Sequence, residues 1–161
     1  MAGTLPPSIA SPAAEPPSAA VERYARYWRE LAPETVGDLQ GLAAPEMRFR
    51  DPFNELQGAE AVVAMLRRAL AGGGDLRFDI TDIAVSGRAA YYRWRCSLSH
   101  PRLNGAGSWR LEGMSEVTFD AAGRVLTHVD HWDAAEQMLA RLPFIGWFVR
   151  ALRRRFKEPT T

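Results

Sequence analysis

The sequence predicts an α+β fold in which helices near the amino end pack on one face of a curved antiparallel sheet. Apolar residues in the first third recur at helical spacing, as in Val21, Tyr24 and Trp28. From Asp75 onward, four consecutive runs alternate between apolar and polar residues. Their short connections favour antiparallel neighbours, so we expect a meander of strands. The last stretch returns to helical spacing and predicts a C-terminal amphipathic helix.

Length and composition are those of one ordinary globular domain. The chain has 161 residues, of which 47% are hydrophobic and 24% charged. Its one cysteine, Cys96, excludes an intrachain disulfide and a thiolate metal cluster, and favours the reducing cytoplasm. Six of the 20 basic residues lie between positions 141 and 157, which leaves 14 basic against 19 acidic residues elsewhere. We therefore expect no nucleic-acid partner.

The chain divides into three segments. Residues 1–17 are rich in Pro, Ala and Ser, and they lack the basic start and long apolar run of a signal peptide. This composition predicts a disordered leader. Residues 18–136 are expected to form the folded domain, and residues 137–161 a basic, amphipathic helical extension.

The first elements are marked by caps and prolines. Ser18 is a suitable N-cap, and Pro33, Pro45 and Pro52 each stop an element. Three consecutive glycines at positions 72–74 close the last helix before the strands. The expected elements are a helix from Ser18 to about Leu31, a short helix over residues 35–43, a strand over residues 47–51 and a helix over residues 59–70.

Charge helps to set the register of the later strands. If Arg93 and Arg95 share an outer face with Arg110, Glu112 and Glu116, opposite charges pair across neighbouring strands. The alternate residues then point inward. The expected strands are residues 76–85, 89–99, 108–119 and 125–133, and the inward set is Tyr92, Trp94, Cys96, Leu98, Trp109, Leu111, Gly113 and Ser115.

The last predicted strand, reading VLTHVDHWD, carries the most distinctive polar residues. Alternation sends Leu126, His128, Asp130 and Trp132 to one face, and Val125 with the other odd-numbered residues to the opposite face. A histidine and a carboxylate two residues apart can share a proton or a water. Periodicity alone leaves either face as the buried one, so a solvated polar face is the alternative.

Four short sequence patterns, taken together with the order of helices and strands, are informative about the family of folds. Val21-Glu22-Arg23-Tyr24 lies in the first helix, Phe49-Arg50-Asp51-Pro52 ends a strand, and Phe119–Val125 leads into a strand that ends Asp130-His131-Trp132-Asp133. Over roughly residues 19–136 these patterns resemble the nuclear-transport-factor-2-like superfamily, which includes ketosteroid isomerase, limonene-epoxide hydrolase and SnoaL-like polyketide cyclases. The resemblance implies a cone-shaped curved sheet with the N-terminal helices packed on its concave face.

The resemblance also implies site residues. Tyr24 corresponds to the oxyanion donor of the isomerase and Asp51 to its base, whereas Ser115 stands where that enzyme has an acid as second donor. The epoxide hydrolase flanks an arginine with two aspartates. Asp130 is similar to the aspartate of the last strand, and the other has no counterpart here.

The residues and the resemblance together predict a cofactor-independent acid–base enzyme. An isomerase, cyclase or epoxide hydrolase of this kind would act on an apolar carbonyl compound, polyketide or epoxide. The alternative is a non-catalytic module that binds a hydrophobic metabolite or lipid. We expect no metal site. The candidate catalytic residues are Asp51, Tyr24, His128 and Asp130, and the candidate substrate-binding residues are Phe53, Trp28, Trp94, Trp109, Ser115 and Trp132.

Each candidate has a purely structural alternative. Asp51 before Pro52 is typical of a strand-end turn, where it would cap the backbone. Tyr24 and the tryptophans would be ordinary core residues.

The expected partners are a hydrophobic small molecule and a second copy of the chain. Relatives in the superfamily dimerise through the outer sheet face. The apolar residues predicted for that face are Tyr91, Ile83, Val85, Val125 and Val129.

The C-terminal extension carries an apolar stripe and a basic face. Phe144, Phe148, Leu152 and Phe156 recur every four residues after Pro143, with arginines on the other side. We expect the segment from Phe144 to Lys157 to pack over the mouth of the cone or on a partner chain. Weak peripheral contact with an anionic membrane is the alternative.

Overall fold

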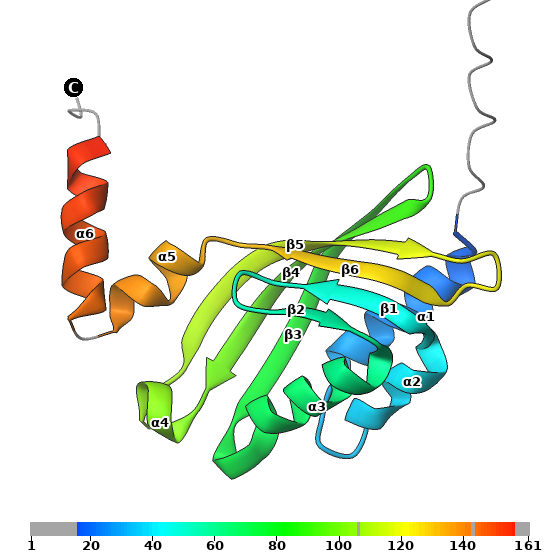
Figure 1. The fold of residues 1–161 in the computed structure, drawn as a ribbon, viewed down its shortest axis with the longest axis horizontal. Coiled ribbons are helices and arrows are strands. Elements are labelled where there is room, and N and C mark those ends of the chain that lie inside the picture. The colour runs from blue at the N-terminus through cyan, green and yellow to red at the C-terminus, as the bar shows by residue number, and fades with distance from the viewer. Residues whose placement is uncertain (1–15, 106, 143, 157–161) are drawn as a thin grey trace, which may run out of the picture.

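The computed structural model describes residues 16–105, 107–142 and 144–156. Six strands form one sheet in the order β2-β1-β6-β5-β4-β3. Helices α1 (Ser18–Arg29), α2 (Leu39–Leu42) and α3 (Ala59–Leu70) lie along one face, and the long strands bend across them (Figure 1). The predicted α+β fold with a curved sheet is confirmed.

The helices follow the predicted pattern closely. Helix α1 begins at Ser18, with Pro17 rather than Ser18 in the N-cap position, and ends at Arg29. Helix α3 spans the predicted residues. The expected helix over residues 35–43 is instead a 3-10 turn, η1 (Val36–Asp38), followed by the single turn α2, because Ala43 already belongs to a strand.

The strands confirm the meander and correct the sheet. Strands β3 (Asp75–Ser86), β4 (Ala89–Ser99), β5 (Trp109–Phe119) and β6 (Val125–His131) are consecutive antiparallel neighbours. Strand β1 (Ala43–Arg50), however, pairs with β6 in parallel, so the purely antiparallel prediction is wrong. The connection from β1 to the meander runs through α3. A long connection that contains a helix allows two strands of one sheet to run in parallel. The hairpin partner of β1, β2 (Glu55–Gln57), was not predicted because three residues carry no pattern.

The predicted register of the central strands is confirmed. Arg95 lies opposite Glu112, whereas Trp94 lies opposite Gly113 and Tyr92 opposite Ser115 on the inner face. Trp94 and Tyr92 are buried and Arg95 is exposed.

Two bulges change which residues reach the outer face. The register shifts between Ile80 and Asp82, so that Ile83 and Val85 pair with the inward-facing residues of β4. A second shift at Phe119 places Val125 in the core, where it is fully buried. The prediction that these three residues form apolar outer surface is therefore wrong, because one extra residue reverses the alternation of a strand.

The segments outside this frame are short helices. A 3-10 turn, η2 (Ala71–Gly73), follows α3, and the unpredicted α4 (Pro101–Asn104) lies in the connection between β4 and β5. After β6 come α5 (Ala134–Gln137), the 3-10 turn η3 (Leu139–Arg141) and α6 (Ile145–Phe156). No helix within the described residues is long and apolar enough to span a membrane.

Helix α6 stands apart from the sheet, beyond the end at which α4 lies (Figure 1). The main neighbour of α6 is η3, and its large apolar side chains are exposed, with Phe148 at 62% and Phe156 at 81%. The prediction that this stripe packs over the mouth of the cone is therefore wrong for the described residues. Pro143 and Lys157, which bounded the predicted helix, lie outside them.

Candidate active site

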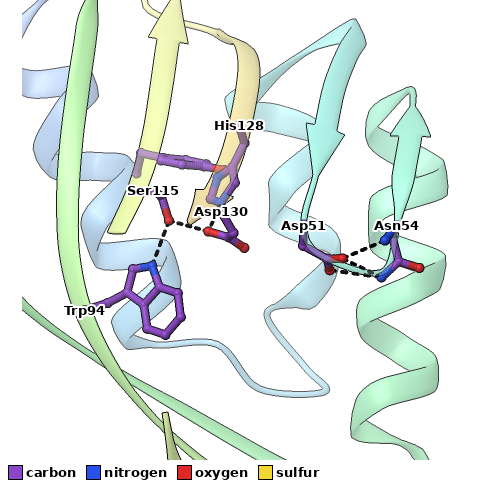
Figure 2. A network of polar contacts seen from close by, with 7 residues as sticks. Asp51, Asn54, Trp94, Ser115, His128 and Asp130 are labelled. Atoms are coloured by element: carbon purple, nitrogen blue, oxygen red, sulfur yellow. Dashed lines mark hydrogen bonds and ion pairs between the residues drawn. The ribbon is translucent and has the colours of Figure 1, made fainter. Parts of the chain in front are cut away.

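Asp130 on β6 is the centre of a buried polar network. Its Oδ1 atom accepts a hydrogen bond of 2.5 Å from the Ser115 hydroxyl and one of 2.8 Å from Nε2 of His128. Ser115 Oγ in turn accepts a bond of 2.9 Å from the indole Nε1 of Trp94 (Figure 2). The inner faces of β4, β5 and β6 thus contribute one residue each to a chain that fixes the carboxylate of Asp130.

His128 connects this carboxylate to the first helix. The hydroxyl of Tyr24 lies 2.7 Å from His128 Nδ1, and both side chains are almost completely buried. A neutral imidazole that donates through Nε2 accepts at Nδ1, so this network assigns the Tyr24 hydroxyl as donor. Burial raises the pKa of Tyr24 well above its usual range, and the phenol therefore stays protonated.

The other oxygen of Asp130, Oδ2, lies outside this hydrogen-bond network. No hydrogen bond to Asp130 Oδ2 is found among the described residues, and this oxygen points away from Ser115 in Figure 2. Asp130 lines a cavity of about 270 Å³, and its side chain keeps 16% of its surface exposed. One oxygen is therefore fixed by the protein and the other is available to a bound molecule.

The cavity wall is mostly apolar and aromatic. Trp28 from α1, Trp94 from β4 and Trp132 after β6 all line it, as does Phe53, whose ring lies 5.8 Å from that of Trp132. Further apolar lining residues are Phe49, Met65, Leu66, Leu76, Phe78, Leu98, Leu103, Leu111 and Met138.

Asp51 lines the same cavity, but its oxygens are occupied. Oδ1 accepts bonds of 2.7 Å from the backbone N–H groups of Phe53 and Asn54. The Asn54 side-chain amide contacts both oxygens, at 3.0 and 2.9 Å (Figure 2). This is the capping arrangement typical of an Asx turn.

Apart from Trp109, the predicted catalytic and binding residues therefore fall into two groups, those that line the cavity and those that support Asp130 from behind. Asp51 and Asp130 share one cavity wall, whereas Tyr24, His128 and Ser115 lie behind Asp130. Trp109 does not line the cavity; its ring packs beneath the guanidinium of Arg141 at 5.7 Å.

A much smaller cavity adjoins the network. Its volume is about 10 Å³, and its lining includes Trp28, Ser115, His128 and Asp130. Such a volume is close to the minimum that holds one water. The Trp28 Nε1 atom is buried without a hydrogen-bond partner among the described residues.

Sequence reasoning gave no binding role to several residues that line the cavity. His100 reaches it from the end of β4, and its Nδ1 accepts a bond of 3.2 Å from the backbone of Arg102. Asn54 and Met138 also contribute to the wall. His100 and Asn54 lie in turns and Met138 in an irregular segment, where alternation gives no signal. Among residues that the structure describes, no cluster of three or more His, Cys, Asp or Glu side chains suited to a metal ion is found.

Comparison with protein families matches residues 21–128 to the model of the SnoaL-like domain. This range contains most of α1, strands β1 to β5 and the first four residues of β6, together with Asp51, Ser115 and His128, and it ends two residues before Asp130. A comparison with curated proteins found no match.

Solved structures share the fold at low sequence identity. An LEH-like epoxide hydrolase of Mycobacterium tuberculosis is 18% identical, with a TM-score of 0.59 over 74% of this chain and 84% of that one. A hypothetical protein from Catenulispora acidiphila with a ketosteroid isomerase-like fold is 13% identical, with a TM-score of 0.63 over 77% and 92%. A candidate isomerase of the SnoaL-like family from Agrobacterium tumefaciens is 23% identical, with a TM-score of 0.56 over 71% and 95%. These similarities establish the fold.

Proposed function

This chain belongs to the SnoaL-like domain family, and from that premise we propose that it is an acid–base enzyme that works without a cofactor. Its substrate is a small, largely apolar carbonyl compound, and Asp130 is the base that removes a proton from the carbon next to the carbonyl.

The orientation of Asp130 carries this proposal. Ser115 and His128 both bond to Oδ1, which leaves Oδ2 without a partner among the described residues, on a side chain that lines a mostly apolar cavity. This oxygen is thus free to meet the C–H group of a bound apolar molecule. Side chains held by packing and hydrogen bonds also keep the base in place.

The cavity limits the class of substrate. Its volume of about 270 Å³ lies just below the range of roughly 300–1,000 Å³ usual for small-molecule sites. Three tryptophans in its wall favour a flat or cyclic apolar molecule. A compact ring fits this space better than an extended polycyclic molecule.

The proposed step is a proton transfer that balances within the site. Asp130 Oδ2 takes the proton, and the electron pair of the C–H bond moves to the carbonyl oxygen to form an enolate. Asp130 then returns the proton to carbon, at the same or at a conjugated position.

We prefer a carbonyl compound to an epoxide because epoxide opening also needs an acid for the departing oxygen. Asp51 is the other acidic side chain that lines the cavity among the described residues. Its oxygens already accept hydrogen bonds from backbone and amide N–H groups, so neither is free to serve the departing oxygen.

A generic carbon acid tests the proposal without knowledge of the natural substrate. In 5-nitrobenzisoxazole, removal of the ring C–H proton breaks the N–O bond and gives a coloured phenolate. We expect Asp130→Asn to lower kcat/KM for this probe by roughly 10²–10⁴-fold. Asp51→Asn is the matched control at the same cavity, and we expect most of its activity to remain.

A measurement of ligand binding, made beside the turnover assay, distinguishes an enzyme from a non-catalytic binding module. A fluorescent apolar dye should bind equally well to wild type and Asp130→Asn. Dye binding by the wild type without turnover of the probe would instead identify a non-catalytic module for hydrophobic metabolites. Equal turnover by wild type and Asp130→Asn would contradict the role of Asp130.

A further inference from the structure

Helix α6 presents an apolar stripe to solvent. Ile145, Phe148, Leu152 and Phe156 lie on one side of the helix at successive three- and four-residue spacings, and each is at least 47% exposed. Trp147, on another side of the helix, is 66% exposed. Aromatic residues of this size are rarely left in water by a single helix unless the surface has a partner.

A second side of α6 is fixed to the preceding turns. Arg153 forms an ion pair of 2.9 Å with Glu136 of α5, and the Arg150 guanidinium donates to the carbonyl oxygen of Ala140. Gly146, on this same side, is buried. These contacts hold α6 against α5 and η3, and α6 as a whole stands apart from the sheet (Figure 1).

The charge of α6 indicates the chemistry of the partner. The helix contains four arginines and no acidic residue. Arg155 borders the apolar stripe and Arg154 lies farther round the helix, and both are exposed. This combination of an aromatic stripe and flanking arginines is typical of helices that lie in the interface of an anionic membrane.

We propose that α6 docks on the surface of an anionic lipid bilayer. Ile145, Phe148, Leu152 and Phe156 enter the boundary between headgroups and acyl chains, and Arg155 beside them contacts lipid phosphates. Symmetric pairing of two α6 helices would bring together only positive charges, whereas the lipid supplies the opposite charge.

The docked helix lies close in sequence to the cavity. Met138, seven residues before α6, lines the cavity, and the connecting turns are held against α6 by Arg150 and Arg153. Lipid docking does not require catalysis, and Asp130→Asn should bind vesicles as the wild type does.

Vesicle flotation with the full chain tests the proposal. The probes are vesicles of phosphatidylcholine with and without phosphatidylglycerol, at low and at raised salt. We expect wild type to float with the anionic vesicles, and salt to weaken this binding. Leu152→Glu should abolish flotation, and Arg155→Ala should lower the partition coefficient about fivefold.

Matched controls lie at the far end of the sheet. Val85 is a similarly exposed apolar residue, and Arg88 is an exposed arginine in the turn between β3 and β4. Val85→Glu and Arg88→Ala should therefore leave flotation unchanged, and circular dichroism checks the fold of every variant.

Several outcomes would overturn lipid docking. One is the absence of wild-type flotation with anionic vesicles. Equal flotation with neutral vesicles would remove the role of the arginines. Flotation that Val85→Glu weakens as much as Leu152→Glu would locate lipid contact elsewhere. A dimer that Leu152→Glu dissociates, without any flotation, would identify the stripe as a contact between copies of the chain.

Discussion

Asp130 combines rigid support on one oxygen with access to the cavity on the other. Ser115, His128 and Trp94 extend the support across three strands, and Tyr24 completes it from α1. Each member is hydrogen-bonded to the next, so the removal of one leaves a buried polar atom without its partner.

Tyr24 is expected to act on Asp130 through His128. Tyr24→Phe leaves His128 Nδ1 buried without its 2.7 Å partner, and we expect unfolding in urea to show a loss of about 1–3 kcal/mol. For the benzisoxazole we expect a lower kcat. KM should change little, because Tyr24 does not line the larger cavity and so does not contact the substrate.

The control for this change is Tyr91→Phe. Tyr91 lies on β4 opposite Glu116, on the outer face of the sheet. The expected change in its free energy of unfolding is within about 0.5 kcal/mol. Equal stability losses in the two variants would show that the Tyr24–His128 hydrogen bond contributes nothing specific.

Buried acids also make stability depend on alkaline pH. Burial raises the pKa of the Cys96 thiol from 9.0 to about 12. Above pH 9 the unfolded chain therefore loses this proton while the folded chain keeps it, and stability falls as pH rises from 9 toward 12. Cys96→Ala should reduce this slope in urea midpoints measured from pH 8 upward. An identical slope in wild type and Cys96→Ala would refute the assignment.

At the scale of elements, Gly113 on β5 allows the strands to bring the aromatic wall together. A Cβ atom at Gly113 would lie 2.6 Å from the Trp94 ring and 2.8 Å from Cβ of Trp132. Gly113→Ala should cost about 1–3 kcal/mol of stability and weaken dye binding, since both tryptophans line the cavity.

Gly41→Ala provides the comparison for Gly113→Ala. A Cβ at Gly41, in α2, would meet nothing within 4 Å, so this substitution should be neutral or stabilise the protein by up to about 1 kcal/mol. If Gly113→Ala were as stable as Gly41→Ala and bound the dye normally, close packing at Gly113 would not shape the cavity.

The sequence predicts elements better than it predicts their partners. Helices α1 and α3 and strands β3 to β6 carry long periodic patterns, and they lie within two residues of the expected positions. The parallel pairing of β1 with β6 has no local signal, because it depends on the crossover through α3. The bulge after Ile80 shifts the alternation of β3 by one residue. The sequence hides this shift, because apolar β-branched residues occur on both sides of the bulge.

The candidate site was predictable to the same extent. Two-residue spacing placed His128 and Asp130 on one strand face, and their hydrogen bond joins them there. Which oxygen of Asp130 stays open depends on Ser115, fifteen residues away, and on the register of β5 with β6. Likewise, Asp51 before a proline fits both a base and a cap, and only its contacts with Asn54 show the cap.

For the whole molecule, we still expect a homodimer through the outer sheet face. The apolar residues there are fewer than the sequence suggested, with Met114 40% exposed and Tyr91 and Val129 half-buried. Light scattering should give the mass of a dimer at micromolar concentration. Met114→Glu should yield monomers, whereas Val85→Glu should not, and a monomeric wild type would contradict the prediction.

The most direct test of the central claim is hydrogen exchange at a carbon atom. A small cyclic ketone incubated with the protein in D₂O gains deuterium next to its carbonyl if Asp130 removes and returns a proton, and NMR measures this gain. We predict exchange with wild type and with Asp51→Asn, and none above background with Asp130→Asn. Exchange that persists in Asp130→Asn, or that is lost only in Asp51→Asn, would show that Asp130 is not the base.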